Sequence, residues 1–128
     1  MLGFDYGERR LGVAVGQTLT RTAEALVTLP MRDGQPDWTR LAALIAEWRP
    51  TRLVIGLPSA DDGRPHTNAP AIERFARRLA GRYRLPVAFV DERLSSYAAA
   101  EDPQSRRLGV DAVAARLILE TWLADSQG

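Results

Sequence analysis

The 128-residue sequence contains no cysteine and no lysine, and it has a single histidine. Without cysteine the chain forms no disulfide, and it offers neither a thiolate nucleophile nor a thiolate metal site. No apolar run approaches the roughly 18 residues that a membrane-spanning helix needs. The first residues also lack the basic and apolar regions of a signal peptide. These absences predict a cytoplasmic protein that does not bind a membrane.

All 17 basic residues are arginine, and with 16 acidic residues they give a net charge of +1. The bias towards arginine is typical of GC-rich coding sequence, but arginine also binds phosphate through paired hydrogen bonds. A net charge near zero does not exclude nucleic acid, because a basic patch can coexist with an acidic pocket. The length and the 45% hydrophobic content are typical of one globular domain over residues 1–128.

Hydrophobic periodicity predicts an α/β fold. Two alternating strands joined by a hairpin come first, then a third strand stopped by Pro30, a turn over 32–36, and a helix with Asp37 as its N-cap that ends before Pro50. The remaining elements alternate. Strands are predicted over 2–7, 10–16, 24–29, 52–56 and 86–90, and later helices over 70–82, 97–100 and 111–124. Right-handed crossovers then give a five-stranded mixed sheet of order 3-2-1-4-5 with helices on both faces.

Three acidic residues fall where this topology gathers ligands. Asp5 lies in the first strand between two glycines, Glu92 follows a buried strand, and Asp111 begins the last helix. The carboxyl ends of parallel strands meet at one edge of a sheet, so we expect these carboxylates to converge. Converging carboxylates repel one another, and Mg²⁺ or Mn²⁺ would relieve the repulsion. Such a site can hydrolyse a phosphodiester.

Each acidic residue also has a simpler interpretation. Asp111 could serve only as a helix N-cap, and Glu92 could pair with an arginine at the surface. Asp5 is harder to explain in this way, because aspartate is disfavoured within strands.

Six motifs, in order and at suitable spacing from residue 2 to about residue 123, resemble the YqgF/RuvX family of pre-16S rRNA nucleases, which have also been described as Holliday junction resolvases. The motifs are Phe4–Gly7, Arg10–Val15, Val54–Pro58, Asp62-Gly63, Asp91–Ser96 and Val110-Asp111. The resemblance implies a ribonuclease H-like fold, in agreement with the predicted strand order. It also implies that Asp5, Glu92 and Asp111 are the catalytic, metal-binding carboxylates.

The resemblance and the local chemistry also suggest contacts to nucleic acid. Arg93 would order Glu92 or meet a phosphate, and Ser95 and Ser96 would cap a short helix or touch the backbone of the substrate. Arg9 and Arg10, in the first hairpin, are further candidates. The chain is shorter than is usual in the family between residues 100 and 106, and Arg106 and Arg107 stand near the place where the family tends to carry lysine. His66, in a polar loop, is more typical of an incidental surface histidine than of a proton shuttle.

The leading functional hypothesis is a metal-dependent endonuclease in ribosome biogenesis, acting on pre-16S rRNA, either free or within ribosomal particles. The first alternative is resolution of branched, four-way DNA junctions, which needs two active sites and therefore a homodimer. The second is a module that binds nucleic acid without cleaving it. The sequence leaves monomer and homodimer equally open.

Overall fold

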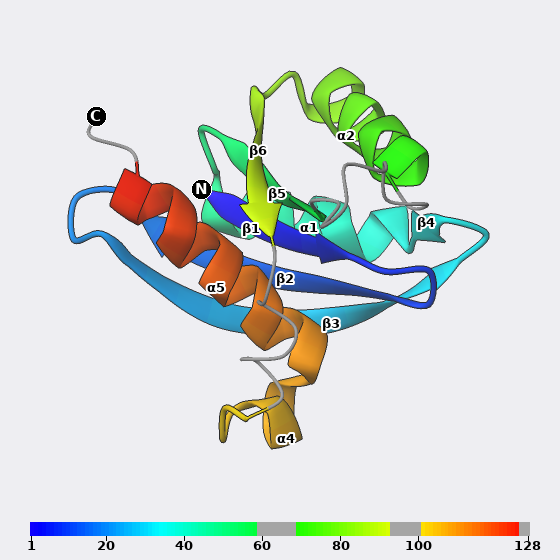
Figure 1. Ribbon diagram of the computed structural model, residues 1–128. Helices are drawn as coiled ribbons and strands as arrows, with labels where there is room; N and C mark the ends of the chain where they lie inside the picture. The colour runs from blue at the N-terminus through cyan, green and yellow to red at the C-terminus, as the bar shows by residue number, and fades with distance from the viewer. Residues whose placement is uncertain (59–68, 93–100, 126–128) are drawn as a thin grey trace.

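The computed structural model describes residues 1–58, 69–92 and 101–125 (Figure 1). It contains a mixed six-stranded sheet of order β4-β3-β2-β1-β5-β6. Neighbouring strands from β1 to β4 are antiparallel, whereas β5 is parallel to β1 and β6 is parallel to β5. The strands are β1 Leu2–Tyr6, β2 Arg10–Gln17, β3 Thr22–Arg32, β4 Gln35–Pro36, β5 Leu53–Pro58 and β6 Val87–Glu92. The predicted order of the five main strands is confirmed.

The structure corrects the prediction at the β3 edge of the sheet. The segment expected to be a turn over 32–36 contains the two-residue strand β4, so the sheet has six strands rather than five. Pro30 does not stop β3, because the N–H of Met31 still donates to the carbonyl of Arg9 at 2.8 Å. Successive residues of a strand direct their N–H groups to opposite sides, so the missing N–H of Pro30 faces the side where β4 pairs only from Met31 onwards.

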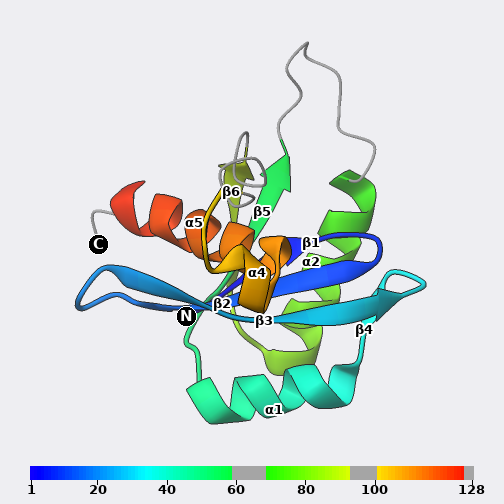
Figure 2. The ribbon, with the colours of Figure 1, turned by 90° about the horizontal axis from the view of Figure 1, so that it is seen from below.

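Helices cover both faces of the sheet, as predicted (Figure 2). Helix α1 (Trp38–Trp48) and helix α2 (Ala69–Tyr83) pack with β1, β2 and β5 in the larger of the buried clusters. The N-cap prediction is confirmed, since the Asp37 carboxylate accepts a hydrogen bond from the N–H of Thr39 at 3.0 Å. Within the described ranges, no helix is long and apolar enough to cross a membrane.

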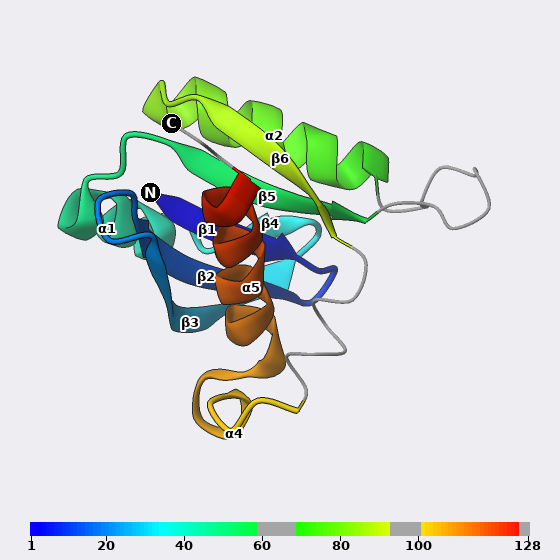
Figure 3. The same ribbon diagram turned by 60° about the vertical axis from the view of Figure 1, so that its left-hand side comes forward.

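Helix α5 (Val110–Asp125) crosses the other face of the sheet (Figure 3). Its Ala115, Ile118 and Leu119 pack against Ala14 of β2 and residues of β5 and β6 in a second buried cluster. The short helix α4 (Ser105–Leu108), which the sequence did not predict, precedes it. The short helix expected over 97–100 lies outside the described residues. Helix α5 therefore runs over the sheet face that carries Asp5.

Candidate active site

Asp5 is positioned by the two aromatic residues beside it in β1. Phe4 and Tyr6 are buried among α1 and α2, and their rings lie 6.1 and 5.2 Å from the ring of Phe75. Alternation along the strand then places Asp5 on the opposite face, below α5, where it is half-buried. The aromatic contacts on one face thus fix the position of the carboxylate on the other.

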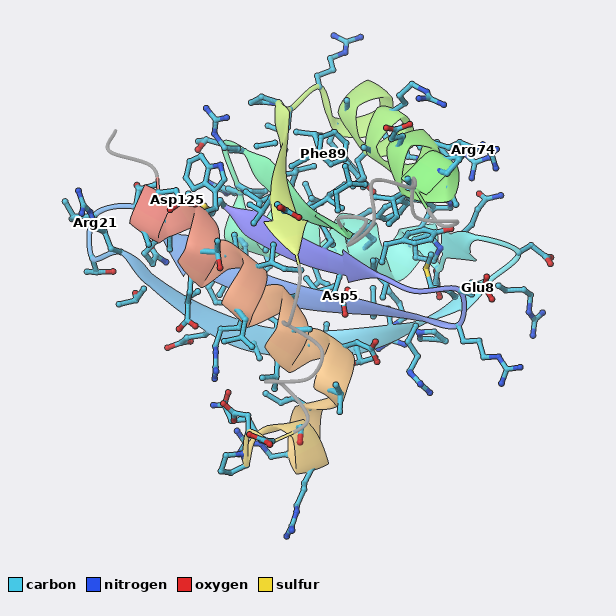
Figure 4. The ribbon with its side chains drawn as sticks, in the orientation of Figure 1. Asp5, Glu8, Arg21, Arg74, Phe89 and Asp125 are labelled. Carbon is cyan, nitrogen blue, oxygen red and sulfur yellow. The ribbon has the colours of Figure 1, made fainter. Side chains whose placement is uncertain are left out.

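Gly12 brings Asp111 to Asp5. In the β1–β2 ladder Gly12 lies directly across from Asp5, so both positions share one face of the sheet. A Cβ at Gly12 would collide with the backbone carbonyl of Asp111. Only a residue without a side chain lets the first turn of α5 rest on the strand, and Figure 4 shows Asp5 beside this part of α5. The first and third predicted acidic residues therefore lie at neighbouring backbone positions, an arrangement that the alternating pattern around Gly12 did not reveal.

Asp111 is ion-paired. Its Oδ2 accepts a hydrogen bond from the Nε of Arg10 at 3.0 Å, with the Arg10 side chain 66% exposed and that of Asp111 24% exposed. Asp111 lies inside the first turn of α5, which starts at Val110, so it is not simply the N-cap of this helix. A pair this exposed contributes only about 0–1 kcal/mol to stability. Its main effect is to place one cationic group on a carboxylate of the candidate site.

The segment before α5 is anchored to β3 and to α5. The hydroxyl of Thr28 donates to the carbonyl of Leu108 at 2.7 Å, and Gly109 has a φ of 93°, a conformation that favours glycine. The carboxylate of Asp102 accepts hydrogen bonds from the Gln104 N–H at 2.9 Å and from Arg116 at 2.8 Å. These two donors lower the pKa of Asp102 below its ordinary value. Together the contacts set where α5 begins, and so where Asp111 lies.

The remaining predicted acidic residue is described only by its backbone. Glu92 is the last residue of β6 and pairs in register with Pro58 of β5, at the same carboxyl edge of the parallel strands as Asp5. Its side chain lies outside the described part of the structure, as do Arg93, Ser95, Ser96 and His66. Among the side chains that are described, no group of three or more acidic residues or histidines could hold a metal ion.

Three other predicted arginines, all within the described residues, are exposed. Arg9 lies beside Arg10 in the β1–β2 hairpin, and Arg106 and Arg107 lie on α4, close in sequence to the start of α5. None of these three forms an ion pair with a described carboxylate. They flank the candidate carboxylates along the chain, and their guanidinium groups are available to solvent.

Comparison with known proteins identifies relatives over nearly the whole chain. The family model described as "RuvX: Holliday junction resolvase" matches residues 1–125. A Pseudomonas paraeruginosa protein named "Putative pre-16S rRNA nuclease" is 50% identical over 132 aligned positions, covering 98% of this chain and 92% of the relative. Proteins of the same name from Azotobacter vinelandii and Nitrosococcus oceani are 48% and 45% identical, covering 98% and 99% of this chain and 93% and 88% of theirs.

A solved structure confirms the fold. The structure described as "T. thermophilus RuvC in complex with Holliday junction substrate" superposes with a TM-score of 0.58 at 14% sequence identity, covering 96% of this chain and 93% of that one. The expected ribonuclease H-like architecture is therefore confirmed.

Proposed function

The chain belongs to the RuvX family, and we propose that it is a nuclease that hydrolyses phosphodiester bonds in structured RNA, with the precursor of 16S rRNA as its substrate. The observation that carries the proposal is the placement of Asp5 and Asp111 on one sheet face, joined through Gly12. Carboxylates at neighbouring positions favour a bound cation. The names of the 45–50% identical relatives support RNA as the substrate class and ribosome biogenesis as the setting, and with it a cytoplasmic location.

We further propose Asp5, Glu92 and Asp111 as the catalytic, metal-binding carboxylates. Their oxygens are the ligands that Mg²⁺ and Mn²⁺ prefer, and the Arg10 guanidinium on Asp111 indicates that this position accommodates positive charge. A divalent ion held there would activate water and stabilise charge on the phosphate. In this proposal Asp5 is held rigid by the aromatic contacts of β1, and Asp111 is held by the anchored start of α5.

The arginines around the carboxylates would bind the phosphate backbone. Arg9 and Arg10 on the hairpin and Arg106 and Arg107 on α4 supply exposed guanidinium groups on elements next to Asp5 and Asp111. Arg93, Ser95 and Ser96 remain proposed contacts that follow Glu92 in the chain. Contacts of this kind orient a strand without reading its sequence, so the substrate would be selected by its shape.

The test is cleavage of a 5′-extended 16S rRNA precursor, free and within ribosomal particles, with Mg²⁺, with Mn²⁺ and with a chelator. We expect metal-dependent cutting by the native protein and its loss in Asp5→Asn, which removes one charge at nearly constant shape. The matched control is Asp33→Asn, because Asp33 lies in the β3–β4 turn with a φ of 54° that asparagine tolerates. Cleavage by folded Asp5→Asn at the native rate would refute the assignment of that residue.

A second candidate follows from the description of the family model as a Holliday junction resolvase. The same carboxylates could cut a four-way DNA junction, and symmetric cutting would require two copies of the chain. A synthetic junction belongs in the same assay, with the oligomeric state measured at the assay concentration. Cutting of the junction alone would favour this candidate, whereas binding of RNA without cleavage in either metal would indicate a non-catalytic module.

A further inference from the structure

A concave surface lies at the opposite end of β1 and β5 from Asp5. It has a volume of about 360 Å³, and its lining includes Thr18, Arg21, Thr51, Arg52, Trp122 and Leu123. Thr18 follows the end of β2, and Arg52 precedes β5, so both lie at the amino edge of the parallel strands. Figure 4 shows Arg21 beside the C-terminal end of α5, away from Asp5. We refer to this hollow as the amino-edge pocket.

The arginine nearest the helix is ordered by an aromatic ring. The guanidinium carbon of Arg52 lies 5.3 Å from the ring centroid of Trp122, and both side chains are half-buried. A cation–π contact of this kind holds the guanidinium beside the ring without using its N–H groups as hydrogen-bond donors to an acceptor side chain. Arg52 is therefore held in place before any ligand binds, which reduces the entropy lost on binding.

Neither arginine of the amino-edge pocket has an acidic partner among the described residues. Among the described residues, the ion pairs involve Arg10 and Arg116, and neither Arg21 nor Arg52 belongs to one. Two guanidinium groups from separate loops therefore line one hollow together with the hydroxyl groups of Thr18 and Thr51. This combination of charge-assisted and neutral donors is suited to the oxygens of a phosphate group.

We propose that the amino-edge pocket binds a phosphate group, with Arg21 and Arg52 as its charged ligands. This deepens the proposed function, on which it rests for the source of the phosphate, a strand of the nucleic acid substrate. Trp122 follows Asp111 by eleven residues on α5, which corresponds to about 17 Å along the helix axis. A strand that is cut at the carboxyl edge would thus be held a second time beyond the reach of the catalytic carboxylates.

The experiment measures binding of a short, end-labelled single-stranded RNA in the presence of chelator, where no cleavage occurs, across a range of salt concentrations. Arg21→Gln and Arg52→Gln should each weaken binding and lower the slope of log affinity against log salt by roughly 0.7, the value for one phosphate contact on a single strand. The matched control is Arg40→Gln, an exposed arginine on α1 in the layer across the sheet, which should leave the slope unchanged.

A parallel titration with inorganic phosphate, followed by the emission of Trp122 and assigned with Trp122→Phe, separates the two sources of phosphate. One outcome is that phosphate changes the Trp122 emission of the native protein while both glutamine variants keep the salt slope of RNA binding of the native protein. This outcome would identify a free anion as the ligand of the pocket. The proposal would be overturned if both variants keep the native salt slope of RNA binding and phosphate does not change the Trp122 emission. Arg21 lies on an exposed loop, so Arg21→Gln still tests the pocket if Arg52→Gln fails to fold.

Failure of this proposal is distinguishable from failure of the proposed nuclease activity. Asp5→Asn should abolish cleavage and keep the response of the amino-edge pocket to phosphate. Arg21→Gln should weaken RNA binding in chelator, a readout that does not depend on cleavage.

Discussion

The two ends of α5 differ in charge and in how that charge is compensated. At its N-terminal end Asp111 lies beside the position of Asp5, and its carboxylate is ion-paired with Arg10. At its C-terminal end the ring of Trp122 contacts the guanidinium of Arg52, which has no described acidic partner. The Asp5–Asp111 site and the amino-edge pocket thus lie at opposite ends of one helix.

The helix dipole favours the positions of Asp111 and Arg52, although the last turn of α5 itself holds Asp125 and no basic residue. The N-terminus of a helix carries partial positive charge and favours carboxylates, and the C-terminus carries partial negative charge and favours cations. Asp111 and Arg52 each lie at the end that suits them. In the two proposals, the carboxylates at the N-terminal end of α5 would attract a metal ion and the guanidinium groups at its C-terminal end would attract a phosphate.

The strongest way to break the comparison is Gly12→Ala. The added Cβ collides with backbone atoms of Asp111. Backbone atoms cannot rotate aside as the end of a side chain can, so the first turn of α5 must shift. Overpacking of this kind costs about 1–3 kcal/mol, and a displacement near 1 Å in a catalytic group can cost about 100-fold in rate. We expect cleavage to fall by that order, measured on the rRNA precursor alongside thermal melting.

Gly81→Ala is the matched control. A Cβ at Gly81, inside α2, meets no atom within 4 Å, and alanine should stabilise the helix by about 0.5–1 kcal/mol without affecting cleavage. If Gly12→Ala cuts as fast as Gly81→Ala, close contact between α5 and β2 is not what positions Asp111.

The sequence predicted the elements better than the contacts between them. Alternation in β1 placed Phe4 and Asp5 on opposite faces, because strand periodicity is local, and the crossover rule supplied the order of the main strands. The Arg10–Asp111 pair joins residues 101 positions apart and depends on how α5 is seated, which no local pattern encodes. Pro30 was misread because its effect depends on whether a neighbouring strand pairs with that side of β3.

The tryptophans show the same limit. Trp38, Trp48 and Trp122 all fall within predicted helices, which favours packing roles for them, and Trp122 does contact the second buried cluster. Its other role, holding the Arg52 guanidinium, joins the end of the last helix to the loop before β5, and nothing in either segment predicts it.

A smaller effect is expected from Arg10→Gln, which sharpens the comparison by removing the cation at the acidic end. Stability should change by less than about 1 kcal/mol, because the pair is exposed. The Asp111 carboxylate loses a competitor, so the Mg²⁺ concentration that gives half-maximal cleavage should fall several-fold. The KM for RNA should rise, because a phosphate contact is lost.

Arg9→Gln serves as the comparison. Arg9 is the neighbour of Arg10, but it forms no ion pair with a described carboxylate. It should raise the KM without changing the Mg²⁺ requirement. An unchanged Mg²⁺ requirement in Arg10→Gln would mean that Arg10 does not compete with the metal for Asp111.

The smallest effect is expected from Asp102→Asn, which loosens the anchor of the acidic end only. The Gln104 N–H and the Arg116 guanidinium hold the pKa of Asp102 below its ordinary value of 3.8. Its stabilising contribution is therefore complete above that value and is lost as the pH falls through the lowered pKa. The Tm of Asp102→Asn should lie a few degrees below that of the native protein at pH 6, and the gap should close towards pH 3.

Asp33→Asn, in the β3–β4 turn, is the control and should show no such pH-dependent gap. Phosphate binding at the amino-edge pocket should be equal in the native protein and both variants. A gap that persists unchanged at pH 3 would mean that the Asp102 charge does not anchor α4, and that Thr28 and Gly109 alone set the start of α5.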